Sequence, residues 1–267
     1  MRLGRAGGEV KAVQKIRLIA RLDVKDHNLV KGIQYEGLRK LGDPHDFALR
    51  YYGQGIDELL YLDTVASLYG RNNLSDILAR TSADVFIPVT AGGGVRSAAD
   101  AEALLRAGAD KVAVNTAAIA RPALITEIAR AFGSQCMVLS VQAKRRDAQN
   151  PAAGWEAYCD NGREHTGLDV LDWVCRAQAL GAGEILLTSV DCEGVGKGMD
   201  IPLYEAVCAR ADVPVIAAGG AGCAADVAGD ARAGAAAAAV GSLLHYGRAT
   251  VAGLKEELAQ MGVEVRR

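Results

Sequence analysis

The chain has 267 residues, of which 50% are hydrophobic and 23% are charged, so it can bury a large core and is not disordered. Its 30 basic and 32 acidic side chains give a net charge of −2, and only 5% of its residues are aromatic. This composition provides neither a basic field for nucleic acid or anionic lipid nor a stacking surface for bases. No apolar run reaches the ~18 residues that a membrane span needs.

Residues 1–16 contain no apolar signal segment, and we interpret them as a flexible N-terminal extension. Six cysteines are spaced too widely for a zinc knuckle, in a chain too large to need disulfides. This pattern indicates free thiols in a reducing cytoplasm, and we expect a cytoplasmic protein.

From residue 17 onwards, short β-rich runs alternate with amphipathic stretches. The β-rich runs are mostly continuous and apolar, which is typical of parallel strands covered on both faces. The predicted strands span residues 17–23, 58–63, 85–90, 111–115, 136–141, 184–190, 213–217 and 236–240. The predicted helices span residues 44–52, 74–80, 98–107, 122–132, 168–180, 201–209, 224–233 and 251–261. Eight strand–helix pairs predict a single (β/α)8 TIM barrel over residues 17–267, with a doubly wound open sheet as the alternative.

The chain also repeats itself internally. Residues 84–116 shifted by 126 positions give 14 identities in 33 without a gap, and Glu58 and Glu184 share this offset. A period of about half the chain indicates two half-barrels that close one barrel. It also predicts two similar ligand-binding corners on opposite sides of the barrel mouth.

Glycine-rich turns follow the third and the seventh predicted strands. AGGGV at 91–95 and AAGGAG at 217–222 allow backbone N–H groups to approach an anion closely. The fourth and eighth strands end in Asn115-Thr116 and Gly241-Ser242, which place a hydroxyl at the start of each following helix. The alternative is that the glycines only make tight turns. The duplicated pairing favours two phosphate sites, which suit an elongated bisphosphate substrate.

Acidic residues at the ends of strands are candidates for proton transfer. Asp23 directly ends the first strand and is the strongest of them. Asp63, Asp191 and Glu193 fit a helix cap or a solvated loop at least as well. The loop after the first strand, which extends to Leu41, could fold over a substrate with Lys25 or Lys31 as a phosphate counter-charge.

Four predicted strands begin with a charged residue, and these residues should meet at the bottom of the barrel. They are Arg17, Glu58, Lys111 and Glu184. Two positive and two negative charges can form a neutral ring, which limits the cost of burying them. From spacing alone, a salt-bridge layer that seals the bottom is favoured over a polar gate for a small molecule.

A series of motifs resembles one family, the cyclase (HisF-type) subunit of imidazole glycerol phosphate synthase. The resemblance runs in order from about Arg17 to the C-terminus. It rests on LDVKD, VKG, GDP, GIDELLYLD, AGGGVRS, GADKVAVNTAA, FGSQ, AKR, DWV, GAGEILLTS and AAGGAG.

The resemblance implies a barrel that receives ammonia from a glutaminase docked on its N-terminal face. The ammonia would cross the barrel and react with a phosphoribulosyl-formimino-aminoimidazole-carboxamide ribotide, giving imidazole glycerol phosphate and an aminoimidazole carboxamide ribotide. No cofactor or metal is implied. The family's gate falls on Arg17, Glu58, Lys111 and Glu184, which reverses the preference for a mere seal.

The resemblance also assigns site residues. The first catalytic aspartate falls on Asp23. The phosphate contacts fall on Gly94, Asn115, Thr116, Gly194, Gly220, Gly241 and Ser242, with Lys31 as a further phosphate ligand. Asp110, which lies beside a gate residue, is a candidate contact for the glutaminase.

Several positions depart from the family pattern. The second catalytic aspartate is replaced by Gln142, whose amide can position a group but cannot transfer a proton. Arg21 stands where the family has a cysteine, His27 where a glycine is usual, and Val195 where a threonine lies near one phosphate.

Two functions remain open on the sequence alone. One is a cyclase of histidine biosynthesis in which Asp23 transfers protons and Gln142 orients the substrate. The other is a related ammonia conduit and scaffold for a separate amidotransferase that modifies a surface-polysaccharide sugar. Residues 143–165 form a long segment that we expect to be a lid or a small hairpin.

Overall fold

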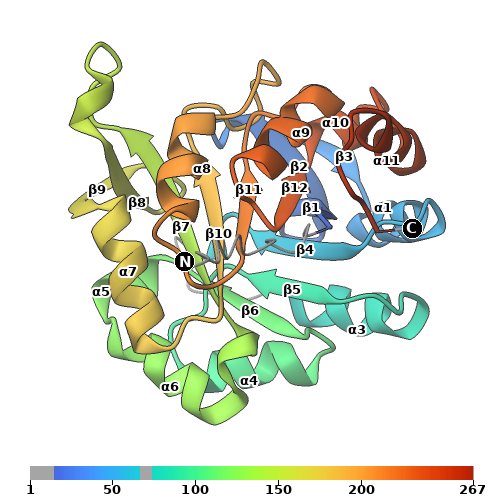
Figure 1. The fold of residues 1–267 in the computed structure, drawn as a ribbon. Coiled ribbons are helices and arrows are strands. Elements are labelled where there is room, and N and C mark those ends of the chain that lie inside the picture. Colours follow the sequence, from blue (N-terminus) through green and yellow to red (C-terminus); the bar gives the residue numbers. More distant parts are fainter. Residues whose placement is uncertain (1–14, 67–73, 267) are drawn as a thin grey trace, which may run out of the picture.

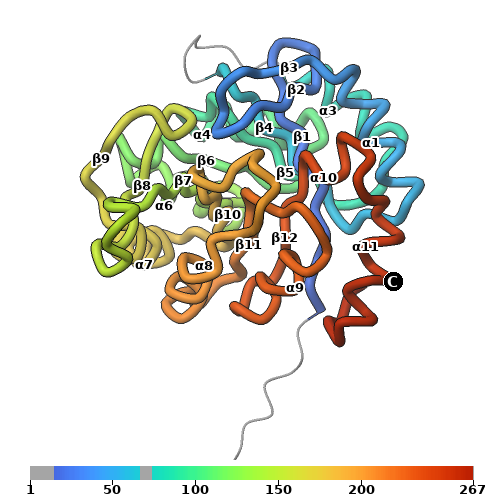
Figure 2. The backbone as a smooth tube through the Cα atoms, turned by 90° about the horizontal axis from the view of Figure 1, so that it is seen from above, coloured from blue at the N-terminus to red at the C-terminus, as the bar shows by residue number. Residues whose placement is uncertain are grey.

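The computed structural model describes residues 15–66 and 74–266. Eight parallel strands form a closed ring, because β12 pairs with β1 and β7 pairs with β10. The ring comprises β1 (Arg17–Lys25), β4 (Glu58–Asp63), β5 (Val89–Gly92), β6 (Lys111–Val114), β7 (Met137–Arg145), β10 (Glu184–Ser189), β11 (Val215–Ala218) and β12 (Ala237–Val240). Figures 1 and 2 show this ring at the centre of the molecule with the helices around it. The (β/α)8 barrel is confirmed, and the open doubly wound sheet is wrong.

The helices that cover the ring are α1 (Pro44–Gly53), α3 (Leu74–Asp84), α4 (Ala98–Arg106), α5 (Thr116–Ala120), α6 (Ala123–Phe132), α7 (Val170–Leu180), α8 (Ile201–Cys208), α9 (Ala224–Arg232), α10 (Ser242–His245) and α11 (Val251–Gln260). Side-chain caps fix where several of them begin. Asp43 accepts the amide of His45 at the start of α1, and Asp169 accepts two amides at the start of α7. Such caps satisfy backbone donors that have no partner inside a helix.

The third and seventh barrel strands begin later than the sequence predicts. Strands were expected from 85 and 213, but β5 begins at Val89 and β11 at Val215. Each begins directly after a proline, and a proline has no N–H to donate to the neighbouring strand. The carbonyls of Pro88 and Pro214 still accept the amides of Leu59 and Ile185.

The internal repeat predicted from the sequence is visible in the boundaries of the elements. An offset of 126 residues separates the first residues of β4 and β10, of β5 and β11, and of β6 and β12. The same offset separates the starts of α4 and α9 and of α5 and α10. The glycine-rich turns at 91–95 and 217–222 therefore occupy equivalent places in the two halves.

Two β-hairpins extend from the carboxyl ends of the barrel strands. The first, β2 (Asn28–Ile33) and β3 (Glu36–Gly42), replaces the long loop that we expected after the first strand. Its first strand continues β1 as an antiparallel partner, since Val24 pairs with Leu29. The second, β8 (Trp155–Cys159) and β9 (Glu164–Asp169), begins within residues 143–165, where we expected a lid or a small hairpin, and extends beyond them to Asp169.

The interior of the ring is a separate apolar cluster. It consists of Ile19, Leu60, Ala113, Val138, Leu186, Ile216, Ala218, Ala237 and Ala239. A larger apolar cluster fills the space between the strands and the helices. Charged groups lie on either side of the inner cluster, so the strands carry a polar layer, an apolar layer and a second polar layer along the barrel axis.

The packed chain begins one residue earlier than predicted. Ile16, which we had assigned to the extension, is buried, and its amide donates to the carbonyl of Glu264. Residues 1–14 of the predicted extension lie outside the described residues. None of the described helices is long and apolar enough to cross a membrane. All six cysteines carry free thiols.

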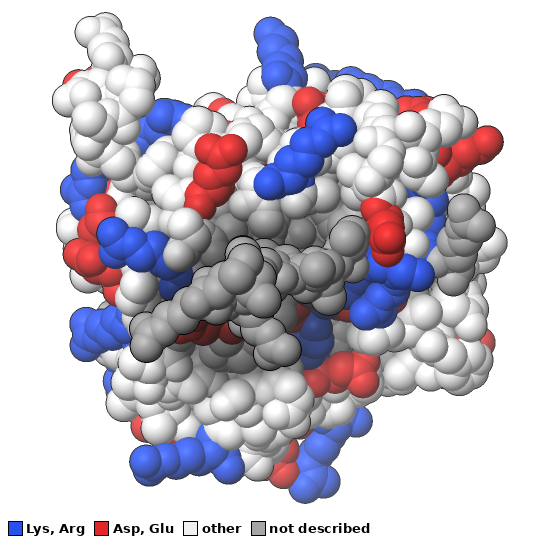
Figure 3. Space-filling model, viewed as in Figure 1, with Lys and Arg blue, Asp and Glu red and all other residues white. Residues whose placement is uncertain are grey.

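On the face shown in Figure 3, basic and acidic side chains are interspersed.

Candidate active site

The four charged residues that open strands meet at the bottom of the barrel. Arg17 donates to Glu58 and to Glu184, both at 2.6 Å. The ammonium group of Lys111 lies 2.6 Å from Glu184 and 3.5 Å from Glu58. Each carboxylate therefore bridges both cations, and we call this closed group the bottom quartet.

The bottom quartet is well shielded from solvent. Arg17, Glu58 and Glu184 are buried, and Lys111 is half-buried. Burial lowers the pKa of the Arg17 guanidinium, but Glu184 and Glu58 raise it more, so its pKa lies above the ordinary value. With two cationic and two anionic side chains, the ring carries no formal net charge.

Asp110 lies next to this quartet in the sequence and is exposed. Its carboxylate accepts the amide of Val89 at 2.8 Å, and its own amide donates to the carbonyl of Val89. The residue thus fixes the first backbone group of β5. Its charge remains available on the outer surface.

At the opposite end of the strands, a cavity of about 380 Å³ opens beside the first glycine-rich turn. Gly94, Asn115, Thr116 and Gln142 all line this cavity. The Asn115 amide nitrogen donates to the carbonyl of Tyr158, and the Thr116 hydroxyl accepts the amide of Asp160. The β8–β9 hairpin therefore holds this corner in place.

The second corner brings together the other predicted phosphate ligands. Lys31, Gly194, Gly220, Gly241 and Ser242 line a cleft of only about 10 Å³. Gly194 has a φ of +73°, and a Cβ there would lie 2.2 Å from the carbonyl oxygen of Gly32. Only glycine fits at that point. The β2–β3 hairpin packs against the corner and leaves little free space in it.

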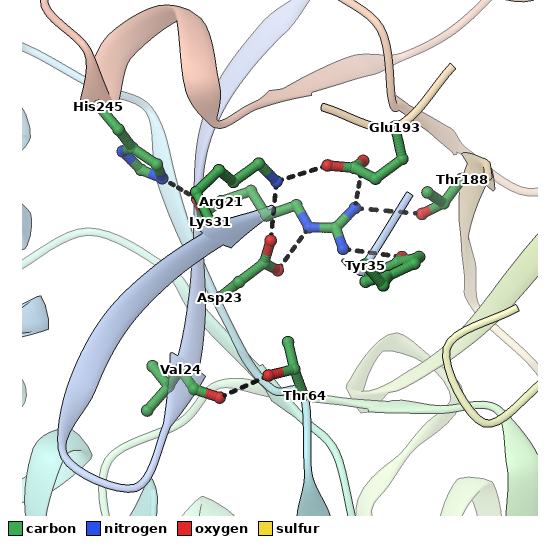
Figure 4. A network of polar contacts seen from close by, with 9 residues as sticks. All are labelled: Arg21, Asp23, Val24, Lys31, Tyr35, Thr64, Thr188, Glu193 and His245. Carbon is green, nitrogen blue, oxygen red and sulfur yellow. Dashed lines mark hydrogen bonds and ion pairs between the residues drawn. The ribbon is translucent and has the colours of Figure 1, made fainter. Parts of the chain in front are cut away.

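A second closed group of four charges lies beside the second corner (Figure 4), and its Arg21 also lines the large cavity. Arg21 donates to Asp23 at 2.8 Å and to Glu193 at 3.1 Å. Lys31 contacts the same two carboxylates, at 2.8 Å and 2.5 Å. We call this group the mouth quartet, and each of its side chains is at most 4% exposed.

The mouth quartet sets the ionisation of the predicted catalytic aspartate. Burial raises the pKa of the Asp23 carboxyl, but Arg21 and Lys31 lower it more, and the resulting pKa is about 2. Burial also raises the pKa of Glu193, which the same two cations bring below its ordinary value. Asp23 is therefore an anion throughout the neutral range.

Gln142 lies where the family has its second aspartate, at the inner wall of the large cavity. Its Oε1 accepts the amide of Gly162 from the β8–β9 hairpin at 2.9 Å. Among the described residues, its amide nitrogen has no hydrogen-bond partner, so this donor is left for a ligand. The contact agrees with a positioning role and offers no proton-transfer group.

The remaining acidic candidates have backbone partners. Asp63 accepts the amides of Val65 and Ala66, and Asp191 accepts the amide of Arg145. Asp63 therefore caps a local turn, whereas Asp191 joins its loop to the end of β7. Glu193, in contrast, belongs to the mouth quartet, and Lys25 is exposed and contributes nothing to it.

Sequence reasoning missed the roles of Arg21 and Tyr35. Arg21 was noted only as a departure from the family, although it contacts five other groups at the mouth. Tyr35 had no motif at all, yet its hydroxyl accepts from Arg21 at 2.9 Å. A lone arginine inside an apolar strand run was the one available signal, because a buried guanidinium needs several acceptors.

No cluster of three or more His, Cys, Asp or Glu residues that could hold a metal ion occurs in residues 15–66 and 74–266. The site is therefore built from anions, cations and backbone amides. The site thus lies at the carboxyl ends of the parallel strands of a (β/α)8 barrel, and each half of the barrel contributes one glycine corner.

Comparison with known proteins shows to which family the chain belongs. The model of the family described as histidine biosynthesis protein matches residues 17–250, and the chain belongs to that family. Three similar proteins are each named imidazole glycerol phosphate synthase subunit HisF. One from Legionella pneumophila is 59% identical over 210 residues, which are 79% of this chain and 97% of the relative. Those from Mycobacteroides abscessus and Beutenbergia cavernae are 50% and 47% identical over 252 residues, 94% of this chain and 98% of each relative.

Proposed function

We propose that this chain is the cyclase subunit of an imidazole glycerol phosphate synthase. It uses ammonia from a partner glutaminase to convert phosphoribulosyl-formimino-aminoimidazole-carboxamide ribotide into imidazole glycerol phosphate and aminoimidazole carboxamide ribotide. The observation that carries the proposal is the pair of glycine corners at the carboxyl ends of the strands, both lined by Arg21, whose guanidinium binds Asp23. The names of the relatives favour this reaction over a conduit for sugar amidination.

The two corners divide the work of binding a bisphosphate. The corner at Gly94, Asn115 and Thr116 is open and takes one phosphate directly. The second phosphate must enter the closed corner, where Gly220 and Ser242 provide the wall. To do so it competes with Asp23 and Glu193 for the ammonium group of Lys31, because a phosphate is also a strong acceptor of charge-assisted hydrogen bonds.

This competition also prepares the catalytic carboxylate. A phosphate that draws Lys31 away removes one of the two cations that lower the pKa of Asp23. The pKa then rises towards the working pH, and the carboxylate becomes a better proton acceptor. Asp23 carries the proton transfers of the steps that follow the addition of ammonia, and the amide nitrogen of Gln142 orients the substrate.

Ammonia would enter through the bottom quartet, which is closed in this structure. The glutaminase docks on this face, with the charge of Asp110 as a contact. Asp110→Asn keeps an oxygen for the amide of Val89 and removes only the charge. We expect this variant to bind the glutaminase more weakly in a pull-down at micromolar concentration, with an unchanged melting temperature.

The decisive experiment supplies the purified chain with ammonium salt and the ribotide substrate, without any glutaminase. We expect formation of both products, and we expect Asp23→Asn to abolish it. No turnover by the wild type would contradict the cyclase assignment. Turnover that persists in Asp23→Asn would keep the assignment and remove Asp23 from the mechanism.

A further inference from the structure

The turn of the β2–β3 hairpin places one aromatic side chain inside the mouth. Gln34 and Tyr35 both have positive φ values, +51° and +64°, in a two-residue turn between Ile33 and Glu36. Such turns favour asparagine and glycine, and a bulky residue there is strained. The residues around it are exposed, but Tyr35 is only 6% exposed. Strain of this kind is found where a side chain must reach a defined position.

The hairpin turn is anchored to the far side of the mouth. The amide of Gln34 donates to the carbonyl of Glu193 at 2.8 Å, and its side-chain nitrogen donates to the carbonyl of Asp191 at 2.8 Å. These bonds fix the turn over the loop that follows β10. The phenol ring of Tyr35 therefore has a set place and direction.

The hydroxyl of Tyr35 is supported on one side and free on the other. It accepts a hydrogen bond from Nη2 of Arg21 at 2.9 Å, as Figure 4 shows. Arg21 is its only hydrogen-bond partner among the described residues. Tyr35, Arg21 and Gln142 line the same cavity of about 380 Å³. The hydroxyl hydrogen is thus available to a ligand in that cavity.

We propose that Tyr35 is a catalytic residue that donates its hydroxyl hydrogen to the substrate oxygen at the carbon that ammonia attacks. This rests on the proposed cyclase function and supplies the transferable proton that the amide of Gln142 cannot provide. Arg21 is a positioning residue, because it acts through the phenol oxygen and does not itself take part in the transfer.

The step is balanced without any further reactant. Ammonia forms a C–N bond to the ketone carbon of the ribulosyl chain, and the carbon–oxygen π electrons move to the oxygen. That oxygen takes the phenol hydrogen, and the resulting phenolate, stabilised by Arg21, recovers a proton from the newly formed ammonium group. The product is a neutral carbinolamine, and Tyr35 returns to its initial state.

The surroundings keep the phenol in the form that this step needs. Burial raises the pKa of Tyr35 above its ordinary value, although the Arg21 guanidinium acts in the opposite direction. The hydroxyl therefore carries its proton over the whole neutral range. Arg21 lowers the energy of the phenolate only when it forms, as expected for a preorganised donor pair.

The test is Tyr35→Phe, assayed with ammonium salt and the ribotide substrate. We expect kcat to fall by ~10²–10³, as for the loss of one preorganised donor, while KM stays close to that of the wild type. Tyr246→Phe is the matched control, since that ring is 46% exposed and lies outside the cavity; its activity should be unchanged. Circular dichroism and the melting temperature should match for all three proteins.

Two further variants separate catalysis from packing. Gln142→Asp restores a proton donor to the cavity, so it should raise kcat more in the Tyr35→Phe background than in the wild type. Arg21→Lys keeps a charged donor, and we expect it to retain more kcat than Arg21→Met. A purely structural role for Arg21 would make the two Arg21 variants equally active at equal stability.

The outcomes are distinct. A wild-type kcat in Tyr35→Phe would overturn the role of Tyr35 and leave the cyclase assignment intact. A rise in KM with unchanged kcat would also overturn it, since that result marks uniform binding. An inactive wild type would overturn the assignment and this inference together.

Discussion

The barrel carries one closed group of four charges at each end, and the two groups are built differently. In the bottom quartet, the four side chains come from four different barrel strands, β1, β4, β6 and β10. In the mouth quartet, Arg21 and Asp23 come from β1, whereas Lys31 lies on a hairpin and Glu193 on a loop. Arg17 and Arg21 lie on the same face of one strand, separated by Ile19 of the apolar layer.

The difference explains what each group can do. The strands of a closed barrel cannot shift separately, so the geometry of the bottom quartet follows from the strand register. The mouth quartet depends on two segments that hold its Lys31 and Glu193 and can move when a ligand competes for them. Each group has two cations and two carboxylates, and the mouth group stands beside a cavity.

The largest effect should follow from Asp23→Asn, because this change removes the carboxylate to which we assign the proton transfers. We expect kcat to fall by ~10²–10⁴ with ammonium and with glutamine alike. Glu184→Gln in the bottom quartet should instead preserve the rate with ammonium and lower the rate with glutamine. Steady-state kinetics with both nitrogen sources checks the contrast. If Glu184→Gln lost as much rate with ammonium as with glutamine, the bottom quartet would not act separately from the site at the mouth.

The bottom quartet could be predicted from the sequence, but the mouth quartet could not. Each bottom residue is the first residue of a strand, and Glu58 and Glu184 repeat at the internal offset, so strand alignment alone brings them together. The contact of Arg21 with Glu193 spans 172 positions and depends on how a hairpin and a loop fold. No periodicity in the sequence reports such a contact.

The same distinction applies to the fold. Strand order, barrel closure and the repeat follow from the alternation of apolar runs and from the 126-residue offset. The β2–β3 hairpin was expected as a loop because its turn, Gln34-Tyr35, lacks the glycine and asparagine that mark such turns. Its position depends on tertiary contacts to Glu193 and Arg21.

The stabilities of the two quartets should respond differently to phosphate when each loses one carboxylate. Glu184→Gln leaves Arg17 and Lys111 with one shared carboxylate and an excess positive charge at a buried site. We expect the free energy of unfolding in urea to fall by about 3–5 kcal/mol. Glu193→Gln removes the carboxylate that bridges Arg21 and Lys31 at the mouth. Inorganic phosphate can bind these two cations instead, so it should restore part of the stability that this variant loses. Recovery of Glu184→Gln by phosphate would contradict the view that only the mouth group receives anions.

The smallest effect concerns pH and isolates the contribution of Arg21. The pKa of Asp23 is lowered to about 2, so its stabilising contribution is complete above its unfolded pKa of about 3.8 and is lost as the pH falls towards 2. Arg21→Gln removes one of the two lowering cations, so the pKa of Asp23 should rise. The midpoint of acid unfolding, followed by circular dichroism, should then move up by about 1 pH unit.

The control for this shift is Arg17→Gln, which removes an arginine from the same strand but from the other quartet. Arg17→Gln should lower the stability at neutral pH without changing the pKa of Asp23, because the apolar layer around Ile19 separates the two quartets. Equal shifts of the acid midpoint in both variants would mean that net charge, and not the contact of Arg21 with Asp23, determines the pH at which the protein unfolds. A shift of the acid midpoint in Arg21→Gln alone would establish that the mouth quartet lowers the pKa of Asp23 independently of the bottom quartet.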